Sequence, residues 1–111
     1  MVDNQNGESS ETIRRRVELA RQVQRERFHK HQPYTNAQMQ SRHIRTFCAL
    51  NSEGEQLLAQ VTQRLGLSAR SYGRILKVAR TIADLSGEQN ILQPHLAEAI
   101  QYRSLDRPVH S

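Results

Sequence analysis

The pattern of apolar and polar residues along the chain is that of amphipathic helices rather than strands. It is clearest over 68–85, where apolar residues recur at intervals of three and four positions. The residues on the apolar side are Tyr72, Ile75, Leu76, Ala79, Ile82 and Ala83. The residues on the opposite side are Arg70, Arg74, Lys77 and Thr81. This spacing predicts a helix with one face in the core and one basic face toward solvent.

The first half of the chain predicts two more helices. One covers about 11–29 and is capped by Ser9 or Ser10. Its Arg and Glu residues alternate at helical spacing, which is typical of a solvated helix docked by one narrow face. Its apolar positions are Ile13, Val17, Ala20 and Phe28. A short helix over about 41–48 is expected to bury Ile44, Phe47 and Cys48.

Local signals predict where the remaining helices begin and end. Ser52 and Glu55 form the capping-box pattern that opens a helix, and Gly66 closes that helix in the left-handed conformation. The helix over 68–85 is expected to begin after a capping Ser68 and to end at Gly87. A fifth helix opens at Gln93–Pro94, with proline at its first position. The residues that it is expected to bury are Leu96, Ala97 and Ile100.

No segment shows the strict alternation of a strand, so the pattern predicts an all-α fold. We expect a small bundle of about five helices over residues 11–107, with 1–10 as a disordered leading segment. A chain of 111 residues with 36% hydrophobic residues and no Trp is sufficient for one domain with a modest core.

Composition adds three expectations about the surroundings of the protein. The net charge of +5 favours anionic partners such as nucleotides or nucleic acid. Cys48 is the single cysteine, which excludes an internal disulfide and indicates the reducing cytoplasm. No apolar run approaches the roughly 20 residues that span a bilayer, so no membrane association is expected.

Several kinds of chemistry are missing from the sequence. The five glycines are scattered and none precedes a lysine, so there is no phosphate-binding P-loop. No strand ends in paired carboxylates for magnesium, which excludes a self-contained ATPase and leaves no catalytic residue. Cys48 with His29, His31 and His43 matches none of the common zinc spacings, so no metal site is predicted.

Arg70 is the residue that suggests a ligand. It stands in the first turn of the helix over 68–85, where the backbone N–H groups already create a positive potential. A cation there weakens the helix, and a phosphate is the group that would make it favourable. Arg74, Lys77 and Arg80 fit the solvated face of the helix, and for Arg74 and Lys77 the pattern leaves a functional role equally open.

A second interpretation treats Gly66 and Ser68 as the turn of a DNA-binding helix-turn-helix. The second helix would then expose Arg70, Gly73, Arg74 and Lys77 where base-reading side chains lie. Both helices are long for that motif, and no dimer seam provides a second half-site. We keep a stand-alone helix-turn-helix domain as the alternative.

Three stretches resemble the C-terminal domain of magnesium-chelatase-like AAA+ ATPases, and within them the bacterial YifB/ComM branch. The stretches are RTFCAL at 45–50, GLSARSYGRILKVARTIADL at 66–85 and HLAEAIQYR at 95–103. The resemblance covers about residues 11–107 and implies the helical lid of a two-part ATPase module. It departs at Gln40, where a capping Ser is expected, so the second helix is placed from Ser41.

The resemblance implies that Arg70 is the sensor-2 arginine, which reaches the γ-phosphate of ATP, and Arg74 is a second candidate. ATP and Mg²⁺ are then cofactors of the whole protein, held with its own N-terminal P-loop ATPase domain, and the isolated segment has none. The other implied partners are neighbouring subunits of a ring, a hexamer, and DNA. The whole protein is expected to be a DNA-processing motor in recombination and natural transformation.

Overall fold

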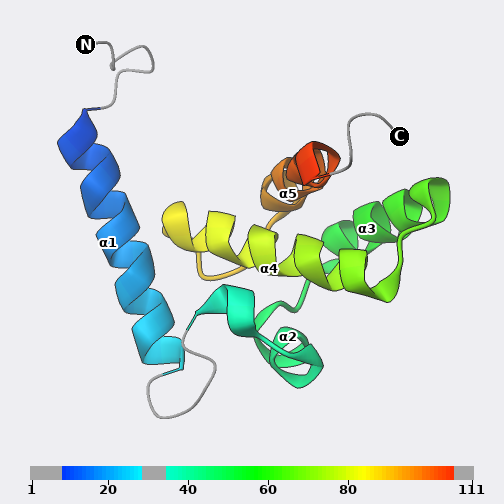
Figure 1. Ribbon diagram of the computed structural model, residues 1–111, viewed down its shortest axis with the longest axis horizontal. Coiled ribbons are helices and arrows are strands. Elements are labelled where there is room, and N and C mark those ends of the chain that lie inside the picture. The colour runs from blue at the N-terminus through cyan, green and yellow to red at the C-terminus, as the bar shows by residue number, and fades with distance from the viewer. Residues whose placement is uncertain (1–8, 29–34, 107–111) are drawn as a thin grey trace.

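A computed structural model describes residues 9–28 and 35–106, and this part of the chain is helical (Figure 1). No strand forms within it; Leu50 and Ile91 make only an isolated parallel bridge. The elements are α1 (Ser10–Arg27), the short 3₁₀ helix η1 (Asn36–Gln38), α2 (Ser41–Phe47), α3 (Ser52–Leu65), α4 (Ala69–Leu85) and α5 (Gln93–Asp106). The predicted all-α bundle of five helices is confirmed, and η1 is an addition that the pattern did not indicate.

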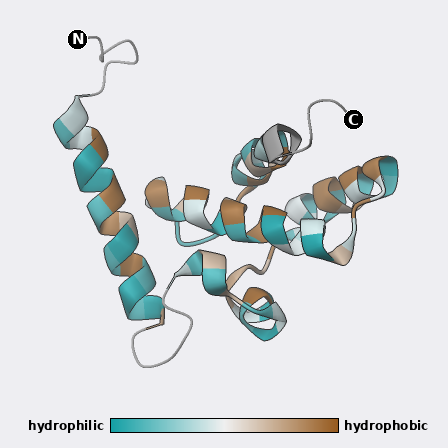
Figure 2. Ribbon diagram, viewed as in Figure 1, coloured by the Kyte–Doolittle hydropathy of each residue, from teal (hydrophilic) through white to brown (hydrophobic). Residues whose placement is uncertain are grey.

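Helix α4 is the centre of the domain. Helices α1, α2 and α5 and the η1 turn all pack against it, whereas α3 packs against α5 (Figure 1). Figure 2 shows α4 with distinct apolar and polar surfaces, while α1 is mostly hydrophilic. The other elements are therefore positioned by their contacts with α4.

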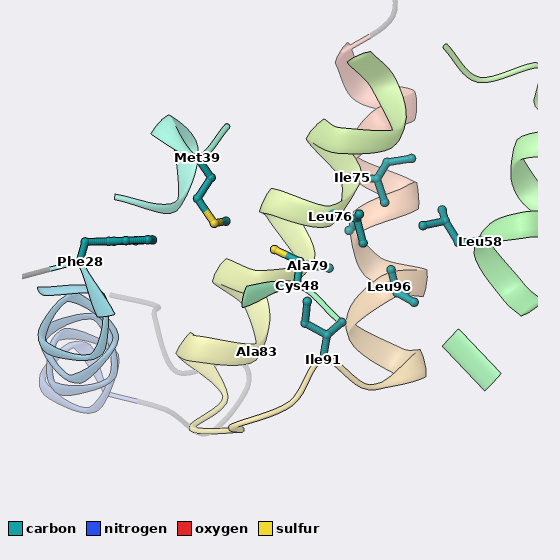
Figure 3. Packing of buried hydrophobic residues seen from close by; sticks show 11 residues of the cluster. Phe28, Met39, Cys48, Leu58, Ile75, Leu76, Ala79, Ala83, Ile91 and Leu96 are labelled. Carbon is teal, nitrogen blue, oxygen red and sulfur yellow. The ribbon is translucent and has the colours of Figure 1, made fainter. Parts of the chain in front are cut away.

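The core lies on both sides of α4 (Figure 3). Phe28, which directly follows α1, and Met39 approach it from one side, and Leu58 of α3 and Leu96 of α5 lie on the other. The α4 residues in the core are Ile75, Leu76, Ala79 and Ala83. These four confirm the predicted apolar face, since burying such side chains is the main favourable contribution to folding.

The burial of some residues expected in the core is incomplete: Ile44, Phe47, Ile82 and Ile100 are only partly buried against it, and Tyr72 and Ala97 are exposed. Tyr72 is 38% exposed, because it lies one turn from the N-terminal end of α4, where fewer elements cover the helix. Ala97 is exposed, and the buried residues of α5 are His95, Leu96 and Ala99. These three share one face at spacings of one, three and four, whereas Ala97 is turned away from it.

The helix ends follow the predicted signals with two corrections. The Ser9 and Ser68 side chains accept hydrogen bonds from the backbones of Thr12 and Ser71, and Gly66 has a left-handed φ of 63°. Ser52 was predicted to cap α3, but Asn51 does so: its side chain accepts from the N–H of Gly54 at 2.8 Å. Asn is as good a cap as Ser, and Ser52 is already helical.

Helices α4 and α5 are joined by a tight connection. Gly87 has a φ of 74°, and the N–H of Glu88 returns to the carbonyl of Ala83 at 2.9 Å, so α4 ends as predicted. Helix α5 begins at Gln93, so Pro94 is its second residue and not its first. His95 Nδ1 accepts from the backbone of Leu92 at 2.9 Å and stabilises this start. Position 29, the predicted end of the first helix, lies outside the described residues.

Candidate functional site

Arg70 is the second residue of α4, and its side chain is exposed. The capping Ser68 satisfies the N–H of Ser71 at 3.1 Å, so the first turn is ordered without help from Arg70. Within the described part of the chain, Arg70 makes neither an ion pair nor a side-chain hydrogen bond. The guanidinium is therefore presented at the surface of a helix N-terminus, a position suited to a phosphate oxygen.

The basic face of α4 becomes progressively covered along the helix. Arg74, one turn after Arg70, is exposed and has an interaction partner within the domain. Lys77 is half-buried, and its Nζ donates to the carbonyl of Ala37 at 3.3 Å. Surface for a partner is therefore offered by the first two turns of α4, not by its whole length.

A shallow hollow of about 320 Å³ lies beside these first two turns. Ala69, Tyr72 and Gly73 of α4 line it together with residues of α2 and of the start of α3. Tyr72, expected in the core, is one of the residues that line this hollow and remains partly exposed. The hollow and Arg70 belong to the same end of α4, which is the least covered part of that helix.

Arg80 differs from the solvated residue that the helical pattern allowed. It is 4% exposed, and its guanidinium donates to the carbonyls of Phe47, Glu88 and Gln89 at 3.2, 3.0 and 3.1 Å. Burial lowers the pKa of Arg80 and the nearby Asp84 carboxylate raises it. Among the described residues, its Nε is a buried atom without a hydrogen-bond partner. The solvated interpretation of Arg80 is therefore wrong, because α2 and the α4–α5 connection cover this part of α4.

Arg80 belongs to a buried group of four residues, here called the polar cluster: Arg27, Asn36, Arg80 and Asp84. Arg27 donates two parallel hydrogen bonds to the Asp84 carboxylate, at 2.8 and 2.9 Å. Asn36 donates to the same carboxylate at 2.8 Å, and Arg80 approaches it at 3.2 Å. The Asp84 side chain is only 1% exposed. The cluster joins α1, η1 and α4 at the end of α4 opposite to Arg70.

The sequence carries one local signal for this cluster. Arg80 and Asp84 are four positions apart, the spacing of an intrahelical ion pair. They are flanked by Ala79 and Ala83, which are fully buried. A charged pair that close to the apolar face indicates a buried pair, although its partners Arg27 and Asn36 could not be found from local spacing.

No metal chemistry or thiol chemistry is supported by the described residues. No group of three or more His, Cys, Asp or Glu side chains among them is arranged to hold a metal ion. His43 Nδ1 accepts from the backbone of Gln40 at 3.0 Å, while His29 and His31 lie outside the described part of the chain. Burial raises the pKa of the Cys48 thiol to about 11, so it is protonated near neutral pH and is not a nucleophile.

The arrangement of α3 and α4 disfavours the helix-turn-helix alternative. In that motif the two helices pack against each other and the second presents a free face to the major groove. Here the main contacts of α3 are with α5, and beyond its exposed first two turns α4 is covered by α1, η1, α2 and α5. The turn at Gly66 is present, but the helix after it is the central helix of the domain.

Comparison with known proteins identifies the family. The family model for the C-terminal region of the magnesium chelatase subunit ChlI matches residues 7–103. This chain belongs to that family. The chain is 48% identical over 101 residues to the competence protein ComM of Haemophilus influenzae and, over the same length, to the uncharacterized protein YifB of Escherichia coli. An uncharacterized Mycobacterium tuberculosis relative, Rv2897c, is 33% identical over 97 residues, or 87% of this chain.

These matches place the domain in the YifB/ComM branch of the magnesium-chelatase-like proteins, as a C-terminal domain of that type. The matched region covers 91% of this chain but only 19% of ComM or YifB. The magnesium-chelatase C-terminal domain is thus a small part of much longer relatives. Among the described residues, no helix is long and apolar enough to cross a membrane.

Proposed function

We propose that this domain is the helical lid of an AAA+ ATPase and that Arg70 is its sensor-2 arginine. The observation that carries the proposal is the exposed guanidinium in the first turn of a capped helix. The positive end of the α4 dipole and the side chain together attract an anion, and the planar guanidinium suits a phosphate. Membership of the magnesium-chelatase family supports ATP as the source of that phosphate.

The rest of the nucleotide site belongs to another domain in this proposal. Arg70 fits a phosphate as one contact, but the described residues offer no carboxylate cluster for Mg²⁺. ATP with Mg²⁺ would be held by an N-terminal P-loop domain, and the metal would supply positive charge to the phosphates there. Helix α4 would bring Arg70 over that site, and the exposed first turns of α4 with their hollow would face the P-loop domain.

The activity of the whole protein is a further part of the proposal. The relative from Haemophilus influenzae is named a competence protein. We propose that the whole protein is a cytoplasmic, ring-forming motor, a hexamer, that processes DNA in recombination and natural transformation. Arg70 would act on the nucleotide of its own or a neighbouring subunit.

Steady-state ATP hydrolysis by the whole protein that carries this domain tests the role of Arg70. Arg70→Ala is expected to lower turnover by ~10²–10³, the usual loss when one group that stabilises transition-state charge is removed. Arg70→Lys should recover only part of it, because an ammonium lacks the two-point contact of a guanidinium. Arg74→Ala is the matched control, one turn away on the same helix. Normal turnover in Arg70→Ala with loss in Arg74→Ala would show that the wrong arginine has been assigned.

The isolated domain provides a second test. Because Arg70 supplies one phosphate contact and the site needs several, ATP with Mg²⁺ should bind this chain no more tightly than about millimolar. Isothermal titration measures this directly. A micromolar site on the isolated chain would contradict the lid assignment.

A further inference from the structure

Helix α1 is attached to the domain by the contacts of its last turn and by Ala20, which lies two turns earlier and is 3% exposed. In the last turn Arg27 makes its two-point contact with Asp84, and the next residue, Phe28, is 5% exposed and belongs to the core. Gln24 Oε1 accepts from the backbone of Asn36 at 3.0 Å and joins the same turn of α1 to η1. The last turn of α1 therefore carries polar, ionic and apolar contacts at once.

The first half of α1 is separated from α4 and α5 by an open groove of about 790 Å³. Ile13 and Val17 of α1 line one side of it, and Ile82 and Leu85 of α4 line another. Ile13 is still 48% exposed, so the groove leaves this side chain only partly covered. The direction of α1 is thus set by the contacts of its last turn together with the packing at Ala20, because the first half of the helix borders the open groove.

The attachment point and Arg70 lie at opposite ends of one uninterrupted helix. Arg70 is in the first turn of α4 and Asp84 in the last, about 21 Å apart at about 1.5 Å of rise per residue. Arg80 joins the Asp84 end to the carbonyls of Phe47, Glu88 and Gln89. Helix α4 is therefore treated as a rigid element. Its first turn exposes Arg70, and its last turn is held in place by the contacts of Asp84 and Arg80.

We infer that Arg27 is a positioning residue that, through Asp84, fixes the angle between α1 and α4. A displacement of the Arg70 end of α4 is then passed to α1, and to any polypeptide that precedes α1. This inference rests on the proposed function for the origin of the displacement, whereas the fixing of α1 does not depend on it. The inference thus extends the lid assignment: helix α1 is the element that couples the lid to the rest of the protein.

The chemistry of the contact suits this role. A bidentate guanidinium–carboxylate pair fixes orientation as well as distance, which a single-point contact does not. The guanidinium carbon also lies 5.9 Å from the ring centres of both Phe28 and Phe47. Because Asp84 is almost fully buried, salt screens the pair little. The Arg27 guanidinium is thus held by the Asp84 carboxylate and by the nearby rings of Phe28 and Phe47.

The attachment of α1 is measured in this chain by the distance between spin labels on Leu19→Cys and Gln60→Cys, with Cys48→Ala in the background. Leu19 and Gln60 are exposed, on α1 and α3. The parent should give one narrow distance distribution. Arg27→Met should at least double its width without changing the helix content, and Arg27→Lys should be intermediate. Arg25→Met, an exposed arginine in the same turn, is the matched control and should match the parent.

Amide hydrogen exchange on the unlabelled chain gives the same information without added cysteines. Arg27→Met should lower protection over α1 by at least ~10-fold and leave α4 and α5 protected, because local opening then no longer breaks the pair. Asp84 keeps Arg80 and Asn36 as partners in this variant, so the domain is expected to fold. Unchanged α1 protection and label distances in Arg27→Met would overturn the inference.

Transmission is tested by ATP hydrolysis in the whole protein. Arg27→Met should lower kcat by ~10-fold, within the usual range for coupling between sites, and leave KM for ATP within about twofold. An unchanged kcat together with a loosened α1 would overturn the inference while the lid assignment stands. Normal ATP turnover in Arg70→Ala would instead contradict the proposed function, whatever the turnover of Arg27→Met.

Discussion

The two ends of α4 carry the same residue type in opposite environments. Arg70 in the first turn is exposed, whereas Arg80, ten residues on, is 4% exposed and bonded to three backbone carbonyls. Nothing in the residue itself distinguishes them; the difference is that α2, η1 and the α4–α5 connection surround the second. An arginine on a helix is therefore a ligand candidate at one end of α4 and a structural residue at the other.

The two ends of α4 also differ in what their charges contribute to the domain. Charge at the covered end is paired, because an isolated buried ion costs several kcal/mol. Charge at the uncovered end costs little in water and is left for a partner. The stability of the domain should accordingly depend on the polar cluster and hardly at all on Arg70.

Removal of the shared carboxylate is the strongest way to break the contrast. Asp84→Ala leaves the guanidiniums of Arg27 and Arg80 buried without their counter-ion, and we expect it to lower the free energy of unfolding by about 3–5 kcal/mol. Urea unfolding followed by circular dichroism measures the change. Glu18→Ala, at an exposed position of α1, is the control and should stay within about 0.5 kcal/mol. A cost below about 1 kcal/mol for Asp84→Ala would mean that the cluster does not hold the covered end.

A comparison of two arginines on α4 sharpens the same point. Arg80→Ala leaves the carbonyls of Phe47, Glu88 and Gln89 without their donor, and we expect a loss of about 1–3 kcal/mol. Arg74→Ala, at an exposed position, should cost under about 1 kcal/mol. Thermal melts of the two variants and the parent rank their stabilities. Superimposable melts for Arg74→Ala and Arg80→Ala would refute the burial of Arg80.

The helices and most of their boundaries could be predicted because their signals are local. Gly66, Gly87 and the capping Ser68 act within one turn of their own positions, and the structure confirms all three. The error at Ser52 is of the same kind, since the neighbouring Asn51 is an equally good cap. Ile75, Leu76 and Ala79 repeat at helical spacing, and this alone identifies the buried face.

Apart from the Arg80–Asp84 spacing, the polar cluster could not be predicted, because it depends on contacts between distant segments. Arg27 and Asp84 are 57 positions apart, and Asn36 reaches the cluster only because η1 packs on α4. Tyr72 was misplaced for a related reason: helical spacing gives its face, but the covering elements decide whether that face is buried. The exposure of Arg70 was predictable, since helical spacing places it opposite to the apolar face of α4.

The smallest expected effect on stability is at the uncovered end of α4. Arg70→Ala removes a cation from the positive end of the helix dipole, so the free energy of unfolding of this chain should stay constant or rise by a few tenths of a kcal/mol. Urea unfolding at low and high salt measures this, and any gain should shrink as salt screens the exposed charge. Arg64→Ala in the last turn of α3 is the matched control, because a cation there is favourable and its loss should act in the opposite direction. A loss above about 1 kcal/mol in Arg70→Ala would show that the side chain supports the fold. In that case the lack of a described hydrogen bond or ion pair at Arg70 would no longer support a phosphate-binding role for this residue.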